Sequence, residues 1–256
     1  MYTELRHELY KLIHRKLPWL VIIIMILFMI IMGIGMGSDY GKLLVMTSYN
    51  SSQIILLLLV IVGSTIFSME FQNKTILTLL YRSKNKSSVF LAKFFTLIIY
   101  SILLHVIAMI VTIIFNMFPL INNPVSLNSI YKYHQYLFVN MLMTTGVDIV
   151  VSILIISLIC LTSCLINSNT IVIVINAIII FMGSGLSSNL LNANVRYVNI
   201  VRWNPLNMLN LTTQYYNYST YHLTSMLSNI QLLMGTILYA MIFLLLGYFV
   251  FRKKKF

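Results

Sequence analysis

Charged residues are few, and they gather in the stretch EFQNKTILTLLYRSKNKSSVFLAKFF, residues 70 to 95. This stretch holds one acid and five bases, namely Glu70, Lys74, Arg82, Lys84, Lys86 and Lys93. At 3.6 residues per turn, Ile76, Leu79 and Leu80 share one helical face, opposite Lys74 and Arg82. This pattern favours docking over bond-making chemistry. Such a helix could rest on anionic lipid headgroups or on a cytoplasmic protein partner, and the pattern alone favours neither.

Polar side chains inside the apolar runs are the second set of candidates. Asp148 lies within TTGVDIVVS, and an acid at membrane depth is costly enough to be a functional candidate by default. It could pair with a neighbouring helix, line a substrate pathway or couple transport to protons. His105 and Asn176 each stand in an apolar run, where structural hydrogen bonding is the simpler interpretation. Together these three residues are the candidates for a translocation pathway.

Motifs for bond-making chemistry are missing. No G-x-x-x-x-G-K-[ST] phosphate loop and no H-E-x-x-H metal motif occurs, so we expect no ATPase site and no bound cofactor in this chain. Cys160 and Cys164 are too few for a metal cage and are interpreted as packing residues. The formal net charge of +12 is interpreted as the bias of cytoplasmic loops toward Lys and Arg, not as a nucleic-acid interface.

The composition predicts an all-α membrane protein. Of 256 residues, 59% are hydrophobic and 9% are charged, where soluble domains carry roughly 25% charged residues. A span needs about 20 mostly apolar residues, and six such runs can be traced within one membrane domain, residues 1–256. They cover Leu17–Met36, Ser51–Met69, Phe94–Phe118, Tyr136–Leu161, Thr170–Leu186 and Leu232–Phe251.

The distribution of bases predicts the orientation of these spans. The N-terminal segment, the 70–95 stretch and the C-terminus lie on one side and hold thirteen Lys and Arg residues, against four on the other side. Because bases favour the cytoplasmic side, we expect both termini and the 70–95 stretch in the cytoplasm.

Two segments outside the spans have patterns of their own. In residues 1–16, charged and apolar side chains fall on different faces of a helix, which predicts an interfacial elbow helix on the inner membrane surface. Residues 187–231 are rich in Asn, Ser, Thr and Tyr, which is typical of a membrane–water interface. There we expect short re-entrant or interfacial helices.

The 70–95 stretch resembles the first cytoplasmic loop of type-2 ABC exporter permeases. The resemblance rests on the order F-x-x-E-x-x-x-x-T-x-x-x-L-L-x-x-S-K…K, carried here by Phe67, Glu70, Thr75, Leu79, Leu80, Ser83, Lys84 and Lys93. In that family the loop is a coupling helix that sits in a groove of the ATPase subunit. The chain is most similar to small Gram-positive peptide-exporter permeases, such as those of phenol-soluble-modulin exporters and lantibiotic-immunity transporters.

The resemblance implies a coupling helix over residues 70–88 and the type-2 ABC exporter fold. Its contacts with the ATPase would come from Glu70, Thr75, Ile76, Leu79, Leu80, Arg82, Ser83 and Lys84. It further implies a separate ATPase subunit that binds ATP and Mg, a second permease chain, identical or homologous, and an apolar or amphipathic substrate, in particular a peptide. Two other functions remain open: a proton-coupled secondary transporter that uses Asp148, and a non-transporting immunity or anchor protein.

Overall fold

The computed structural model describes all 256 residues except 1, 37, 73–85, 119–123, 194 and 255–256. The described residues form helices and no strands, apart from connections such as the loop 124–136, where one β-bridge joins Ile130 and Tyr136. The long helices are α2 (Lys16–Met36), α4 (Ser51–Gln72), α6 (Lys86–Met117), α7 (Leu137–Leu165), α8 (Asn169–Ala193) and α12 (Asn229–Lys253). The shorter elements are α1 (Tyr2–His14), η1 (Ser38–Tyr40), α3 (Gly41–Met46), η2 (Val195–Tyr197), α9 (Val198–Val201), η3 (Asn207–Asn210), α10 (Leu211–Tyr216) and α11 (Tyr218–Ser225).

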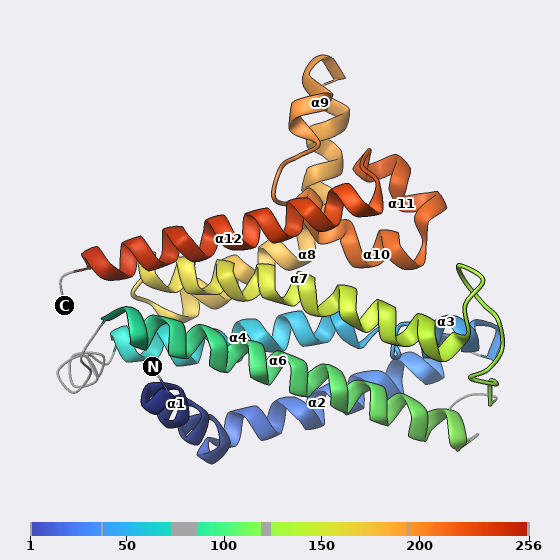
Figure 1. Ribbon diagram of the computed structural model, residues 1–256, viewed down its shortest axis with the longest axis horizontal. Coiled ribbons are helices and arrows are strands. Elements are labelled where there is room, and N and C mark those ends of the chain that lie inside the picture. Colours follow the sequence, from blue (N-terminus) through green and yellow to red (C-terminus); the bar gives the residue numbers. More distant parts are fainter. Residues whose placement is uncertain (1, 37, 73–85, 119–123, 194, 255–256) are drawn as a thin grey trace.

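The six long helices confirm the six predicted spans. Each is long and apolar enough to cross a membrane, and Figure 1 shows the bundle that they form. The main differences are at the ends. The third helix begins at Lys86, about two turns before the predicted start, and the fifth continues to Ala193. Both extensions, KSSVFLAK and SSNLLNA, mix polar with apolar residues, so the continuous apolar run ends before the helix does.

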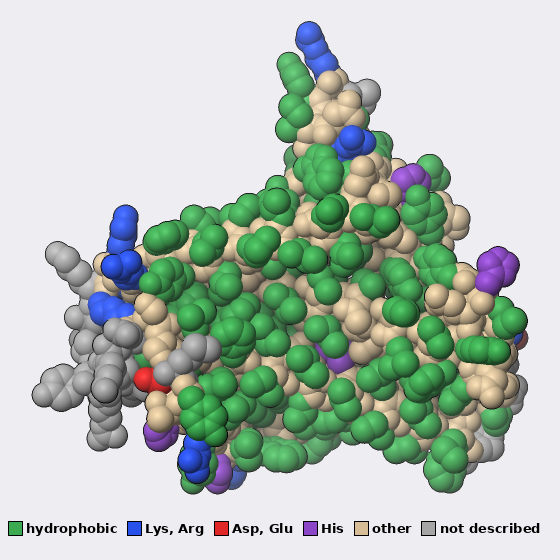
Figure 2. All heavy atoms as spheres, viewed as in Figure 1, with side chains coloured by type: hydrophobic (Ala, Val, Ile, Leu, Met, Phe, Trp, Pro, Cys, Tyr) green, Lys and Arg blue, Asp and Glu red, His purple; other side chains and the backbone are tan. Residues whose placement is uncertain are grey.

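The bundle is most closely packed where α12 lies along α7. A Cβ atom added to Gly247 would lie 3.2 Å from both the backbone nitrogen and the Cα of Leu161, so glycine allows the two backbones to approach. The outer faces are apolar: only 28% of the α2 span and 22% of the α12 span are buried within the chain. Figure 2 shows apolar side chains over the visible flank, as expected for a surface in contact with lipid.

Residues 2–14 form the elbow helix α1. In a simple amphipathic helix all charged side chains would face away from the bundle, and in α1 they do not. Glu8 is as buried as Leu12, so part of the charged face is turned onto the bundle. The turn into α2 is fixed by the Trp19 side chain, whose Nε1 donates a hydrogen bond to the Ile13 carbonyl at 2.8 Å. From α6, the Tyr100 hydroxyl donates to the Pro18 carbonyl at 2.9 Å. The α1–α2 elbow is therefore attached to the bundle by polar contacts.

The outer segment, residues 187–231, is a set of short helices held together by buried amides. Asn207 is fully buried, and its Nδ2 donates to the carbonyls of Arg202 at 2.6 Å and Ser225 at 2.8 Å. Gln214 is also fully buried and donates to the Leu227 carbonyl at 2.8 Å. The segment contacts the bundle through η3 and α10, while the part around α9 projects away from it (Figure 1).

Candidate functional site

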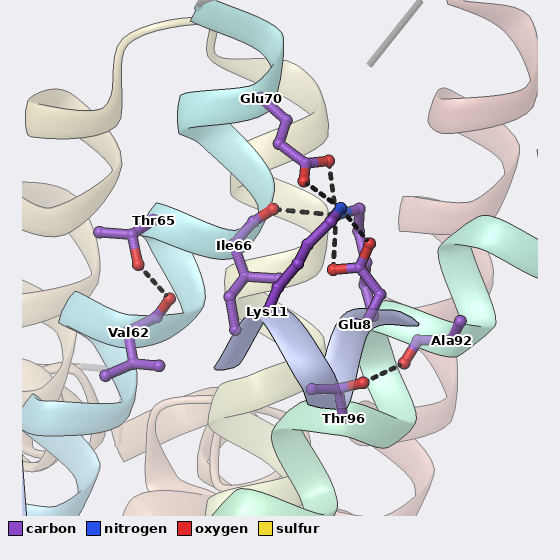
Figure 3. A network of polar contacts seen from close by, with 9 residues as sticks. Glu8, Lys11, Val62, Thr65, Ile66, Glu70, Ala92 and Thr96 are labelled. Atoms are coloured by element: carbon purple, nitrogen blue, oxygen red, sulfur yellow. Dashed lines mark hydrogen bonds and ion pairs between the residues drawn. The ribbon is translucent and has the colours of Figure 1, made fainter. Parts of the chain in front are cut away.

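Four charged side chains form a buried network where α1, α4 and α6 meet. Lys93 of α6 pairs with Glu8 of α1 at 3.1 Å and with Glu70 of α4 at 2.6 Å. Lys11 of α1 pairs with the same two acids, at 2.9 Å from Glu8 and 3.1 Å from Glu70. Acids and bases therefore alternate around a closed ring, and Figure 3 shows Glu8, Lys11 and Glu70 pointing toward one another.

Lys93 is the centre of this network. Its side chain is fully buried, and its ammonium has three N–H donors. In addition to the two carboxylates, it donates to the Ile66 carbonyl at 3.1 Å, one turn before Glu70 in α4. Three acceptors from two other helices thus surround one ammonium group. A buried charge is tolerated only with such partners, and losing one partner leaves the other charge uncompensated.

The electrostatics of the α1 side of the network follow from this pairing. Burial by itself would raise the pKa of Glu8, but the charges and hydrogen bonds of Lys93 and Lys11 outweigh it and lower that pKa below its ordinary value. Burial would likewise lower the pKa of Lys11, but its bonds and charge interactions with Glu8 and Glu70 raise it. Glu8 and Lys11 are therefore both ionised at neutral pH, and their contact is a true ion pair.

Glu70 lies in the last turn of α4, where the helix dipole disfavours a carboxylate. The two lysines stabilise it there. The predicted coupling helix, residues 70–88, shares its ends with the spans: residues 70–72 belong to α4 and residues 86–88 to α6. The other predicted coupling residues lie outside the described residues, namely Thr75, Ile76, Leu79, Leu80, Arg82, Ser83 and Lys84.

The sequence did not predict the roles of Glu8, Lys11 and Lys93 in this network. Glu8 and Lys11 lie in residues 1–16, which were predicted only to form an interfacial helix, and Lys93 was considered only as part of the 70–95 stretch. The chain holds only five acidic residues, so an acid in a helix beside an apolar bundle indicates that a base lies near it. Which base it pairs with could not be predicted, because Glu8 and Lys93 are 85 positions apart.

His105 and Asn176 are buried in different helices and bonded locally. The Nδ1 of His105 contacts the Ser101 carbonyl of its own helix at 2.8 Å. The Nδ2 of Asn176 in α8 donates to the Thr162 hydroxyl of α7 at 2.9 Å, an interhelical contact. No bond within the described part of the chain joins either residue to Asp148, so these contacts do not bring the predicted pathway residues together.

Asp148 is in a different environment from Glu8 and Glu70. It is 5% exposed in the middle of α7, and among the described residues the one side chain that bonds to it is Thr212 of α10. Burial, together with the nearby Tyr221 and Asp148, raises the pKa of Tyr216, one turn further along α10, to about 12. The acid therefore lies against the face of α10 that carries Thr212 and Tyr216.

Thr212 and Tyr216 also line a groove of about 460 Å³. The groove lies between α4 and α8 and is closed on one side by η3 and α10, with single residues from α2, α7 and α11. Its wall mixes apolar residues such as Phe28 and Ile180 with uncharged polar ones such as Asn210. None of the residues that line it is charged.

The comparison with known proteins agrees with this architecture. No curated protein matches the chain. A family model described as ABC-2 family transporter protein matches residues 5–183, from the elbow helix into α8. The match covers more than half of the chain and includes Glu8, Lys11, Glu70, Lys93 and Asp148. The chain therefore belongs to the ABC-2 family of transporter proteins and is a multi-pass membrane permease subunit.

Proposed function

We propose that this chain is the permease subunit of an ABC exporter that moves an amphipathic substrate, in particular a peptide, out of a bacterial cell. ATP hydrolysis in a separate subunit that binds ATP and Mg drives the export. Two permease chains, identical or homologous, and two ATPase subunits make up the working complex. Family membership supports the transport role, and the similarity of the 70–95 stretch to small peptide exporters supports the substrate class.

The observation that carries this proposal is the ionic network. It joins α4 and α6, the two helices on either side of residues 73–85, to the elbow helix α1. In a dry interior, charged pairs of this kind resist separation more than surface pairs do. Movement of residues 73–85 by the ATPase would therefore shift α1, α4 and α6 together, which is what a coupling device needs.

The affinity for the ATPase is expected to come from the apolar face of the coupling helix. Burying a Leu side chain stabilises by about 1.5–3 kcal/mol, so Leu79 and Leu80 together would supply about 3–6 kcal/mol before entropy costs. Rim contacts from Lys74 or Arg82 to acids on the ATPase would add about 0–1 kcal/mol each. Docking is therefore an apolar contact with a charged rim.

Co-purification with the ATPase tests this division of roles. We expect the double variant Leu79→Ala, Leu80→Ala to lose the ATPase. The matched variant Lys74→Gln, Arg82→Gln should retain it, because rim charges contribute little. Retention of the ATPase by the leucine variant together with loss in the charge variant would contradict the proposed face. Tight ATP binding by the purified chain alone would contradict its role as a subunit without an ATPase site.

The proposed orientation places both termini and the coupling segment in the cytoplasm. Figure 2 shows that Lys and Arg side chains gather at the end of the bundle where α1 begins and α12 ends, and on the projecting part around α9. In a cysteine-free background, a membrane-impermeant thiol reagent added outside should label cysteines placed at Lys132 and Tyr216, and not one at Lys84. Labelling at position 84 from outside would overturn this orientation.

A further inference from the structure

Asp148 is buried without a base to balance its charge. In the described part of the chain, every ion pair belongs to the Glu8–Glu70 network, and no Lys, Arg or His pairs with Asp148. Its Oδ1 has no hydrogen-bond partner among the described residues, and solvent cannot easily supply one because the residue is only 5% exposed. An uncompensated carboxylate in such a place needs a cation or a proton from elsewhere.

The position of Asp148 places it deep in the bundle. It is the twelfth residue of α7, so at 1.5 Å per residue it lies about 16 Å from the outer end of that helix. The short helix α10 reaches the same depth, because Thr212 contacts the acid. Thr212 of α10 therefore contacts Asp148 and also lines the groove, to which α7 itself contributes Val151.

The groove beside α10 is suited to one kind of molecule. Its volume of about 460 Å³ is within the range of small-ligand sites and would hold several side chains of a peptide. Its wall offers apolar surface from α4 and α8 and neutral hydroxyl and amide groups from η3 and α10. Phe181 on its rim is 70% exposed, so the groove is open to the surroundings of the chain. None of the described lining residues is charged, and Asp148 lies next to Thr212 and Tyr216.

We propose that Asp148 and the groove lined by Thr212 and Tyr216 form a binding site for the ammonium group of an amphipathic substrate. The apolar wall takes the apolar side of the molecule. The amine, a lysine side chain or a free amino terminus, lies at the two hydroxyls and balances the charge of Asp148. This inference rests on the proposed export function and specifies the charge of its substrate.

A purely structural role explains the same residues less fully. If Asp148 only held α10 against α7, an amide or a hydroxyl would bond Thr212 without the cost of burying a charge. The second carboxylate oxygen would then have no reason to be left without a bond. A permanently protonated carboxyl is the remaining alternative, and the variants below separate it from an ammonium site because it predicts no selection for charge.

The test uses the permease–ATPase complex in nanodiscs of phosphatidylcholine. The probes are a synthetic amphipathic helical peptide of about 20 residues with free amines, and the same peptide with every amine acetylated. Binding is measured by fluorescence anisotropy, with binding to protein-free nanodiscs subtracted. We expect the wild type to bind the amine peptide at least about tenfold more tightly, which corresponds to about 1.4 kcal/mol.

Three variants make the result specific. Asp148→Asn should bring the two affinities within about twofold, while Asp148→Glu, which keeps the charge, should preserve the preference. Asp39→Asn removes an exposed acid outside the groove and should also preserve it. A preference that survives in Asp148→Asn, or one that is missing in the wild type, would overturn the ammonium site.

The same samples separate this inference from the proposed function. If the chain is an exporter permease without an ammonium site, both peptides stimulate ATP hydrolysis equally. If neither peptide binds or stimulates hydrolysis in any variant, the proposed peptide export is wrong, and the ammonium site with it.

Discussion

Glu8 and Glu70 are buried beside two lysines at the N-terminal end of the bundle, whereas Asp148 is buried in the middle of α7 with no described base paired to it. Where the chain supplies its own counter-charges, the acids join helices into one unit. Where it supplies none, the site is left incomplete. We therefore propose that buried acids serve a mechanical role in one region and a binding role in the other.

Removing the central base of the network should have the largest effect. Lys93→Met leaves Glu8 and Glu70 buried with only the half-exposed Lys11 between them. Because breaking one side of a buried ion pair costs about 3–5 kcal/mol, we expect a loss of that size in the free energy of unfolding. Reversible unfolding in mixed detergent micelles measures it.

Two further variants show whether the loss comes from unpaired charge. Lys16→Met removes an exposed base at the same end of the molecule and should cost less than about 0.5 kcal/mol. The triple variant Glu8→Gln, Glu70→Gln, Lys93→Met should recover much of the stability, because no buried charge is left without a partner. If Lys93→Met and Lys16→Met lower the free energy of unfolding equally, the network does not stabilise the bundle.

A change of pH should have a smaller effect on the network, with stability lost in acid through Glu8 and in alkali through Lys11. The pKa of Glu8 is lowered on folding, so its contribution is present above the ordinary value of 4.5 and is lost as pH falls through the folded value. The pKa of Lys11 is raised, so its contribution is present below 10.5 and is lost as pH rises through its folded value. We expect wild type to exceed Glu8→Gln by about 1.5–3 kcal/mol, constant from about pH 5 to 9.

This stability difference should shrink below pH 4.5, as Glu8 takes up a proton in both states. Unfolding measured side by side for the two proteins across this range checks the sign. A difference that grows in acid would mean that Glu8 is stabilised in its protonated form, contrary to its pairing with two lysines.

The smallest effect on stability is expected at Asp148. Asp148→Asn keeps the size of the side chain and removes a charge that no described base balances, so the free energy of unfolding should stay within about 1 kcal/mol of wild type or rise. The same substitution type at the network, Glu70→Gln, should destabilise. If Asp148→Asn destabilises as much as Glu70→Gln, Asp148 has an internal partner and the contrast between the two regions fails.

The sequence predicted the spans because each one is a continuous apolar run, and lipid exposure imposes that pattern locally. The run Leu17–Met36 differs from helix α2 by one residue at its start. The position of Glu70 at the end of the second span was also predictable, since an acid there interrupts the apolar pattern. These features need only local information.

The contacts of both regions depend on the folded bundle and carry no local signal. The pairing of Glu8 with Lys93 joins residues 85 positions apart, and Asp148 meets Thr212 through a helix inserted from the outer segment. The short apolar stretch in α10 is interrupted by Thr and Gln, so hydropathy could not show that it enters the bundle. Asp148 was therefore recognised as a candidate, while its surroundings were not.

The coupling role of the network is tested most directly by counting the peptides exported per ATP hydrolysed. The measurement uses proteoliposomes that contain the complex with the Glu70→Gln variant. We expect the ATPase to remain bound and hydrolysis to stay within about twofold of wild type, while export falls at least about tenfold, because Glu70 links the coupling segment to α1 and α6. Asp39→Asn should leave the ratio unchanged. An unchanged ratio in Glu70→Gln would contradict the claim that the buried network transmits the work of the ATPase.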